Sequence, residues 1–270
     1  MPRFPRRQHR PRLDRLESRA LLAGNVTVAF SGGDLVITGD GSSNAIEITQ
    51  VFLDYYRVVG KSAGGSATKI NNVSNGSFDF ILNSNNYYDD LRITMKGGND
   101  SVTIRGDSGL FGANDIDAPD DLDINMGGGD DRVDLQYVEA QRGDVLIELG
   151  TGKDTVFATN VVAGDDFVIT SDNSTSARVT AHLNRVTVAD ELKVALGGSA
   201  DVVNVSNSRV KDVVVKLRGG DDKLSIRRTT VTRKSLLDGG TGSDKLNRYQ
   251  NNTSFDHEDF NSFSSNDANF

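Results

Sequence analysis

Cysteine and tryptophan are absent from the 270 residues, and proline occurs only four times. The lack of cysteine excludes a disulfide framework and thiol chemistry. No stretch approaches the roughly 18 consecutive apolar residues of a membrane-spanning helix, so we expect no membrane span. The three histidines, His9, His182 and His257, are isolated, and the chain has no phosphate-binding loop, zinc spacing or activated-nucleophile motif. We therefore predict that the protein is not an enzyme.

Glycine is abundant, with 28 residues, and β-branched residues fill the apolar segments, a composition typical of an all-β protein. An internal repeat organises the chain. Its clearest copy, residues 213–226 with the sequence VVVKLRGGDDKLSI, predicts a strand, a glycine-rich corner and a second strand. Six copies superpose on one residue each, which we call the anchor aspartates: Asp100, Asp131, Asp154, Asp201, Asp222 and Asp244.

Apolar residues recur at fixed distances from the anchor aspartates. The position nine residues earlier is apolar in every copy but the last, which has Ser235. The positions seven and five residues earlier and two residues later are also apolar, except for Gly239 in the last copy. A period of two puts these side chains on one face of each strand, which is the predicted interior.

The anchors are separated by 31, 23, 47, 21 and 22 residues, so the basic period is 22 to 23 residues. The longest interval holds two coils, one of them irregular at residues 167–188, and the first holds a coil with an added loop at residues 106–119. So short a unit closes a core only when copies stack in register, about 4.8 Å apart. We therefore predict a parallel β-helix.

A second column predicts a further corner in each coil. Asn160, Asn184 and Asn207 each precede a valine by two or three residues, one coil apart. Asparagine tolerates the left-handed backbone that a tight corner needs, and its amide can bond to the next coil. The predicted coil therefore has three sides.

These patterns divide the chain into four parts. Residues 1–24 form an arginine-rich export or targeting leader, 25–90 an N-terminal β cap with an opening coil, 91–249 the β-helix repeats, and 250–270 a polar C-terminal tail or cap. Placing Asn44 at the anchor position puts Leu35 and Ile46 in the apolar columns of the opening coil. A cap is expected because solenoid ends must cover an open strand edge, although a pair of degenerate coils is an alternative.

Charge is distributed unevenly along the chain. Residues 1–19 contain seven arginines and two acidic residues, a net charge of +5, whereas the whole chain carries −8, which leaves −13 for the body. A basic leader can belong to a nucleic-acid-binding tail, but an acidic body repels phosphates. We therefore expect no nucleic-acid partner.

The leader carries a specific motif. Residues 16–22, LESRALL, lie between arginine-rich residues and AGNV, and they resemble the LEPR-XLL motif at the N-termini of large exported and surface proteins of planctomycetes. Ser18 stands where that motif has proline. The GDLVITGDGSSNAIEI stretch and the GG-x-D corners also resemble the repeat-rich bodies of such proteins. The resemblance implies export and an extracellular or cell-surface location, and it carries over no catalytic residue.

Residues 239–247, GGTGSDKLN, match the calcium-binding nonapeptide G-G-x-G-x-D-x-U-x of RTX proteins, although here the motif comes once per coil and not in tandem. The resemblance implies that Ca²⁺ is held by carbonyls of the glycine region and by aspartate oxygens. The candidate ligands are the six anchor aspartates: Asp100, Asp131, Asp154, Asp201, Asp222 and Asp244.

Electrostatics leaves two interpretations of this column open. Carboxylates about 4.8 Å apart repel by roughly 0.9 kcal/mol at a dielectric constant of 80 and about 3.5 kcal/mol at 20, and a hard cation would relieve this repulsion. In the alternative, each aspartate accepts backbone amides of its own turn, and basic neighbours such as Lys153 and Lys223 supply the counter-charge.

Three functions stay open on the sequence. The first is an exported solenoid with a structural or adhesive role, acting on surface polysaccharide or other cell-surface proteins. The second is a calcium-binding RTX-like module. The third is a carbohydrate-active enzyme, for which the region of Tyr55, Tyr56, Tyr87 and Tyr88 is the candidate, although it shows no acid/base pair. The sequence does not determine the oligomeric state.

Overall fold

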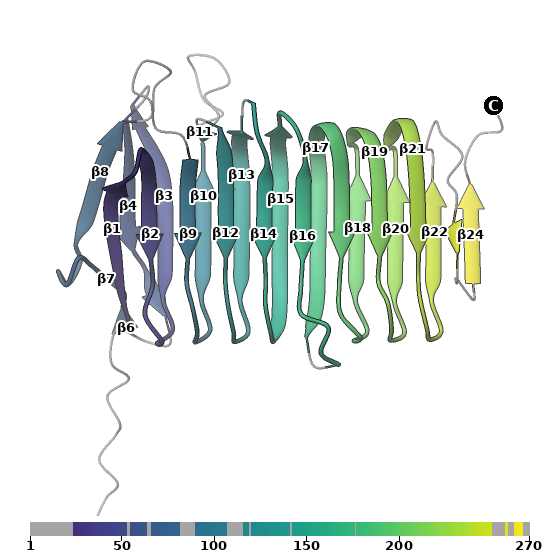
Figure 1. Cartoon of the computed structure of the whole chain (residues 1–270), viewed down its shortest axis with the longest axis horizontal. Helices are drawn as coiled ribbons and strands as arrows, with labels where there is room; N and C mark the ends of the chain where they lie inside the picture. The colour runs from purple at the N-terminus through teal and green to yellow at the C-terminus, as the bar shows by residue number, and fades with distance from the viewer. Residues whose placement is uncertain are drawn as a thin grey trace, which may run out of the picture.

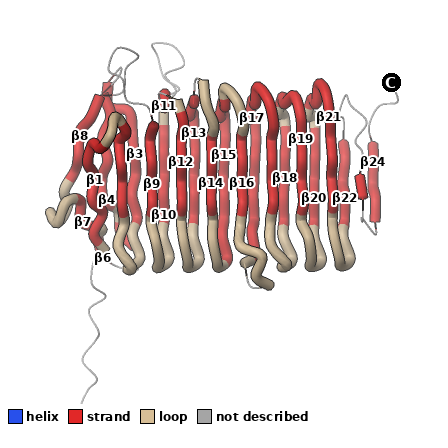
Figure 2. The backbone as a smooth tube through the Cα atoms, viewed as in Figure 1, coloured by secondary structure: helices blue, strands red, loops and turns tan. Residues whose placement is uncertain are grey.

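The computed structural model describes residues 24–52, 55–63, 66–81, 90–106, 116–118, 120–140, 142–175, 177–249, 257–258 and 262–266. They form an all-β solenoid in which parallel strands of successive coils lie side by side (Figures 1 and 2). The predicted parallel β-helix is confirmed. Within these ranges there is no helix with the length and apolar character needed to cross a membrane. The predicted leader, apart from Gly24, lies outside them.

Three sides recur along the solenoid. Side 1 precedes the glycine corner and contains β2 (Asp34–Thr38), β9 (Asp90–Thr94), β12 (Asp121–Asn125), β14 (Val145–Glu148), β16 (Phe167–Thr170), the ends of β17 (Arg178–Ala195), β19 (Arg209–Lys216) and β21 (Thr230–Asp238), and β23 (His257–Glu258). Side 2 follows that corner and contains β3 (Ala45–Phe52), β10 (Ser101–Arg105), the starts of β13 (Arg132–Ala140), β15 (Lys153–Ala163) and β17, then β18 (Val202–Ser206), β20 (Lys223–Arg227), β22 (Lys245–Tyr249) and β24 (Ser262–Asn266). Side 3 is shorter and contains β11 (Ile116–Ala118), the ends of β13 and β15, the middle of β17 and the starts of β19 and β21. The coils that begin at β9, β12, β14, β16, the end of β17 and the end of β19 have all three sides in the described part of the chain, as predicted.

Equal repeat positions lie in register, so the apolar columns merge into one core. On side 1, Leu91 pairs with Leu122, and Val145 pairs with Phe167. On side 2, Val102 is the partner of Val133. All of these side chains are buried in a single cluster that runs along the solenoid. The predicted inward columns are confirmed.

The irregular coil predicted in the longest interval is present. It contains β16 and the start of β17, and its corner at residues 171–175 replaces the glycine corner of the other coils. Val179 is buried in register with Asp154 and takes the anchor position in this coil.

The corner between sides 2 and 3 differs from the prediction at one position. Asn160 and Asn207 have φ values of 54° and 53°, in the left-handed region, but in the coil between them Arg185 has this conformation, with φ of 56°. Asn184 pairs with Thr159, one residue before the corner, so the predicted left-handed backbone at Asn184 is wrong. Its side chain still links coils, because Asn184 Oδ1 accepts Asn207 Nδ2–H at 2.7 Å.

An antiparallel cap covers the N-terminal end of the stack. β2 and β3 belong to the repeat, since Leu35 pairs with Leu91 and Ile46 with Val102. The cap strands are β1 (Asn25–Ser31), β4 (Tyr55–Gly60), β5 (Ser62–Ala63), β6 (Ser66–Ala67), β7 (Lys69–Ile70) and β8 (Ser77–Ile81). β1 pairs antiparallel with β2, β4 with β3, and β8 with β4, so the first coil has no open edge on these strands.

The C-terminal end continues the solenoid where a tail or cap was expected. β23 pairs parallel with β21, and β24 pairs parallel with β22. In this pairing Phe263 lies opposite Leu246 on side 2. The sequence did not predict this coil, because Asn261 stands where six other coils have an anchor aspartate.

The glycine corner limits what side chains the stack can hold. Gly152 has φ of 135°, and a Cβ at this residue would lie 1.8 Å from the carbonyl oxygen of Gly129 in the preceding coil. Gly152→Ala should lower the free energy of unfolding by about 1 to 3 kcal/mol or more, because a backbone clash adds to the strain of the positive φ. Gly41→Ala is the matched control, since a Cβ there meets nothing within 4 Å. Equal urea midpoints for the two variants would contradict this prediction.

Candidate functional site: an interior aspartate column and a surface groove

The anchor aspartates lie inside the corner between sides 1 and 2. All six are between 0 and 2% exposed. Val179 divides the column into two groups of three, with Asp154 the last of the first group and Asp201 the first of the second. Asn44, which is also buried, continues the first group at its N-terminal end.

Each anchor carboxylate links its own coil to the preceding one. The backbone N–H of Asp100 donates to Asp131 Oδ1 at 2.7 Å, and the N–H of Asp131 donates to Asp154 Oδ1 at 2.9 Å. In the second group the N–H of Asp201 donates to Asp222 Oδ1 at 2.7 Å. The structural interpretation of the sequence expected amides of the same turn; the donors observed here belong to the neighbouring coil, so the side chains tie the stack together.

The second oxygen of these carboxylates is not satisfied in the same way. Oδ2 of Asp100, Asp131, Asp154, Asp201 and Asp222 is buried and accepts no hydrogen bond from the described residues. Burial raises the pKa of Asp100, Asp154 and Asp201 to about 7, and that of Asp131 and Asp222 to about 6. Full ionisation of these buried carboxylates at neutral pH therefore costs free energy, which protonation or a bound cation would reduce.

The atoms of the column partly fit the calcium site that the RTX resemblance implies. Carboxylate oxygens are ligands that Ca²⁺ prefers, and the Oδ2 atoms have no competing hydrogen bond among the described residues. The corner carbonyls are less available, because Gly127 O accepts the N–H of Thr151 and Gly128 O accepts that of Gly98, both at 2.9 Å. Calcium binding by the anchor aspartates stays a prediction.

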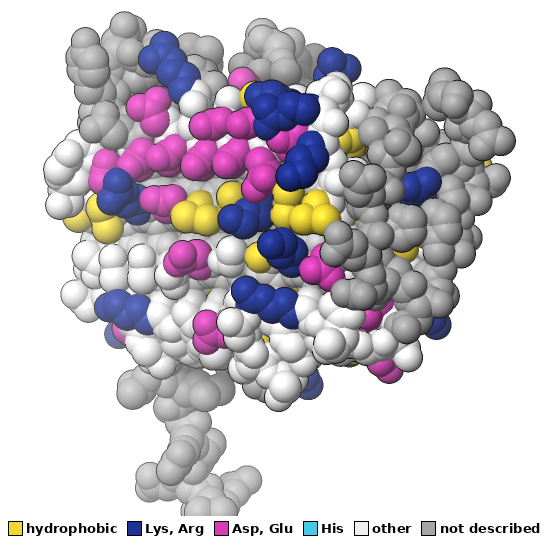
Figure 3. Space-filling view, turned by 45° about the vertical axis from the view of Figure 1, so that its right-hand side comes forward, with side chains coloured by type: hydrophobic (Ala, Val, Ile, Leu, Met, Phe, Trp, Pro, Cys, Tyr) yellow, Lys and Arg dark blue, Asp and Glu magenta, His cyan; other side chains and the backbone are white. Residues whose placement is uncertain are grey.

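A second acidic row follows the corner between sides 3 and 1. Asp144 N–H donates to Asp121 Oδ1 at 2.8 Å, and Asp166 N–H donates to Asp144 Oδ1 at 2.9 Å. Burial, with the negative charges of Asp121 and Asp166, raises the pKa of Asp144. Acidic side chains form a row along this edge in Figure 3. The carboxylate oxygens of Asp165, Asp166 and Asp190 lie within 4.8 Å of one another here.

Sequence reasoning missed this edge, although a signal was present. The position ten residues before the anchor is acidic in five of the six copies, which have Asp90, Asp121, Asp144, Glu191 and Asp212 there. The stronger signal is the set of apolar columns at nine, seven and five residues before the anchor and two residues after it.

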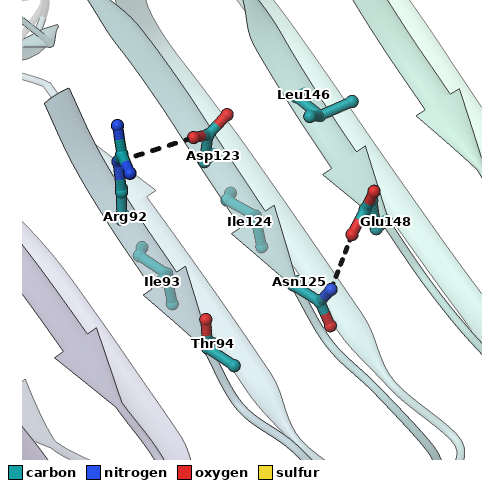
Figure 4. Close-up of a pocket in the computed structure, with 8 residues that line it drawn as sticks. All are labelled: Arg92, Ile93, Thr94, Asp123, Ile124, Asn125, Leu146 and Glu148. Atoms are coloured by element: carbon teal, nitrogen blue, oxygen red, sulfur yellow. Dashed lines mark hydrogen bonds and ion pairs between the residues drawn. The ribbon is translucent and has the colours of Figure 1, made fainter.

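Next to this edge, side 1 has a shallow groove across three neighbouring coils (Figure 4). Its walls are outward side chains of β9, β12 and β14: Arg92, Thr94, Asp123, Asn125, Leu146 and Glu148. Asn125 Nδ2 donates to Glu148 Oε2 at 2.6 Å. Burial, followed by the charges of Asp121 and Asp90, raises the pKa of Asp123.

Arg92 is the cation of the groove, and three carboxylates surround it. Arg92 Nη2 lies 2.5 Å from Asp90 Oδ2, and Nε lies 3.1 Å from Asp34 Oδ2 and 3.8 Å from Asp123 Oδ2. The groove and its rim therefore hold more negative than positive charge. The repeat marks Asp90 but does not predict Arg92, Asp123, Asn125 or Glu148, because these outward positions differ between coils.

The remaining candidates of the sequence have packing roles where they are described. His182 stacks on Phe157 with ring centroids 5.2 Å apart, and its Nδ1 lies 3.2 Å from Asn204 Nδ2. Tyr56 is buried and stacks on Phe80. Tyr55 is bonded to Asp79 through its hydroxyl at 2.8 Å. Tyr87, Tyr88, His9 and the side chain of His257 lie outside the described part.

Comparison with known proteins adds no relative. A scan against models of protein families, a search of curated proteins and a search of solved structures each found no match to this chain. The function is therefore argued from the residues and their geometry.

With divalent cations removed by EDTA, the protein should be less stable at pH 8 than at pH 5. A carboxyl with a raised pKa stabilises the fold below its unfolded pKa of about 3.9, and this stability is lost as the pH rises through the folded pKa. For the anchors that loss begins above about pH 4 and is complete near pH 6 to 7, so pH 5 lies within the window and pH 8 beyond it. One unit of pKa difference corresponds to about 1.4 kcal/mol, so thermal unfolding at the two pH values should detect it.

Asp131→Asn tests whether the column causes this dependence. The amide keeps the acceptor oxygen that Asp131 offers to the N–H of Asp100, and Asn44 shows that the column accommodates an amide. The variant should lose less stability than the parent between pH 5 and pH 8. A parent protein that gains stability over this interval in EDTA would refute the assignment.

Proposed function

We propose that the chain is an exported, cell-surface β-solenoid with a structural or adhesive role and without catalysis. The observation that carries the proposal is the solenoid itself, with its filled interior and with outward side chains arranged in rows on its sides. On such a surface the outward side-chain positions recur once per coil, so an extended partner can contact several coils at once. The leader resemblance supports export.

The stack has the contacts that a rigid scaffold needs. Strands pair on three sides of the coils, and carboxylates of both acidic rows add bonds between coils. The cap protects the first coil from edge-to-edge association. Surface polysaccharide or other cell-surface proteins are the partners we propose, whereas the acidic row on the edge of side 1 opposes nucleic-acid phosphates.

Export is tested with the full chain carrying a C-terminal tag in a planctomycete host. Protease added to intact cells should remove the tag, because the resemblance implies a surface location. Deletion of residues 2–24 should leave the tag protected inside the cells, while total expression measured after lysis stays comparable. A full chain whose tag remains protected would overturn the proposal.

We infer a second candidate function, a calcium-stabilised module, from the buried Oδ2 atoms of Asp100, Asp131, Asp154, Asp201 and Asp222, which accept no hydrogen bond from the described residues. A cation held by these oxygens would replace the missing hydrogen bonds and relieve repulsion along each group of three. Because the carbonyls of Gly127 and Gly128 already accept backbone N–H groups, the carboxylate oxygens would be the main ligands. The interruption at Val179 would make the two groups separate sites.

Millimolar calcium should raise the unfolding temperature at pH 8, and EDTA should reverse the shift. Binding to the folded state alone stabilises it by about 2.7 kcal/mol at a hundredfold excess over the dissociation constant. Asp131→Asn should weaken the effect, whereas Asp172→Asn, at an exposed corner residue, should not. If calcium leaves the melting curve unchanged, the column acts through hydrogen bonds alone.

A further inference from the structure

We propose that the groove on side 1 binds an amine-bearing glycan, with Asp123 and Glu148 paired to its amines and Asn125 bonded to its hydroxyls. The inference rests on the proposed function, because it names the face and the partner through which a surface solenoid would adhere. The groove belongs to the outward rows of β9, β12 and β14 (Figure 4).

Charge decides the class of ligand first. The guanidinium of Arg92 already lies beside the carboxylates of Asp34, Asp90 and Asp123, which neutralise its positive charge and outnumber it, so the groove disfavours a phosphate or an acidic sugar. Glu148 is exposed and adds a further carboxylate to the wall. An acidic polymer would be repelled, and a positively charged one would be attracted.

The environment of Asp123 points in the same direction. Its side chain is partly buried, and the nearby carboxylates of Asp121, Asp90 and Glu148 all make its ionisation less favourable. Arg92 Nε, 3.8 Å from Asp123 Oδ2, offsets this only in part, because Asp90 and Asp34 lie closer to the guanidinium; a ligand amine beside Asp123 would add opposite charge. The groove therefore gains more from a cationic ligand than an isolated exposed carboxylate would.

Hydrogen-bonding groups favour a glycan over a simple cation. Asn125 donates through Nδ2 to Glu148, which holds the amide beside the carboxylate and leaves its carbonyl oxygen as an acceptor for a hydroxyl. Leu146 and Thr94 add aliphatic surface to the same walls, suited to the C–H groups of a sugar ring. These groups come from coils about 4.8 Å apart, so an extended chain can contact several of them at once.

Calorimetric titration of the full chain with a chitosan oligosaccharide, at about pH 6 and low salt, tests the proposal. Binding should be at least about tenfold tighter than to the same oligosaccharide with all amines acetylated, because acetylation removes the charge and keeps the hydroxyls. Polygalacturonate should not bind. Oligolysine of equal charge should bind more weakly than the chitosan oligosaccharide; equal or tighter binding would overturn the assignment to a glycan.

Isosteric variants locate the site. Glu148→Gln and Asp123→Asn should each weaken chitosan binding about fivefold, and the double variant should lose more. Asp172→Asn removes the same charge from an exposed corner outside the groove and should bind as the parent does. Melting temperatures check that the variants fold. Unchanged affinity in the double variant would refute the site, and the export experiment would be unaffected by that result.

Discussion

The close approach of consecutive glycine corners is the constraint on which the rest of the solenoid depends. A Cβ at Gly150 would lie 1.7 Å from the carbonyl oxygen of Gly127, so the backbones pass each other where no side chain fits. Hydrogen bonds between paired strands set the distance between coils, and glycine lets the corners follow at that distance. The apolar columns then meet face to face, and each anchor aspartate comes within reach of the amide of the coil before it.

The anchor column shows how this stacking couples structure to solution conditions. Each carboxylate contributes a bond between coils, but repeating it also buries like charges in a line. Asn44 and Val179 limit that line: the first ends it with an amide, and the second removes a carboxylate from the middle. Because burial raises the pKa of these carboxyls, stability is thereby linked to their protonation.

The sequence predicted what the repeat constrains. Inward residues must match their neighbours in every coil, so the columns, the opening coil and the irregular coil could all be located. The left-handed backbone of Arg185 could not be predicted, because arginine has no preference for that conformation and the stacking of the coils imposes it. The groove was also out of reach, since outward residues such as Asp123 and Asn125 differ between coils and follow no column.

The two acidic rows act on different parts of the molecule although each arises from a single recurring position of the repeat. Inside, the carboxylates have no water to solvate them, so their ionisation acts on folding. At the outer edge, Asp121 and Asp144 stay partly exposed while bonding to backbone amides, so their charge extends over side 1. The groove takes its character from that edge as much as from its own lining, because Asp121 and Asp90 disfavour ionisation of Asp123. The repeat therefore produces the negative charge along side 1. The outward residues of β9, β12 and β14, which differ between coils, form the groove at one place within it.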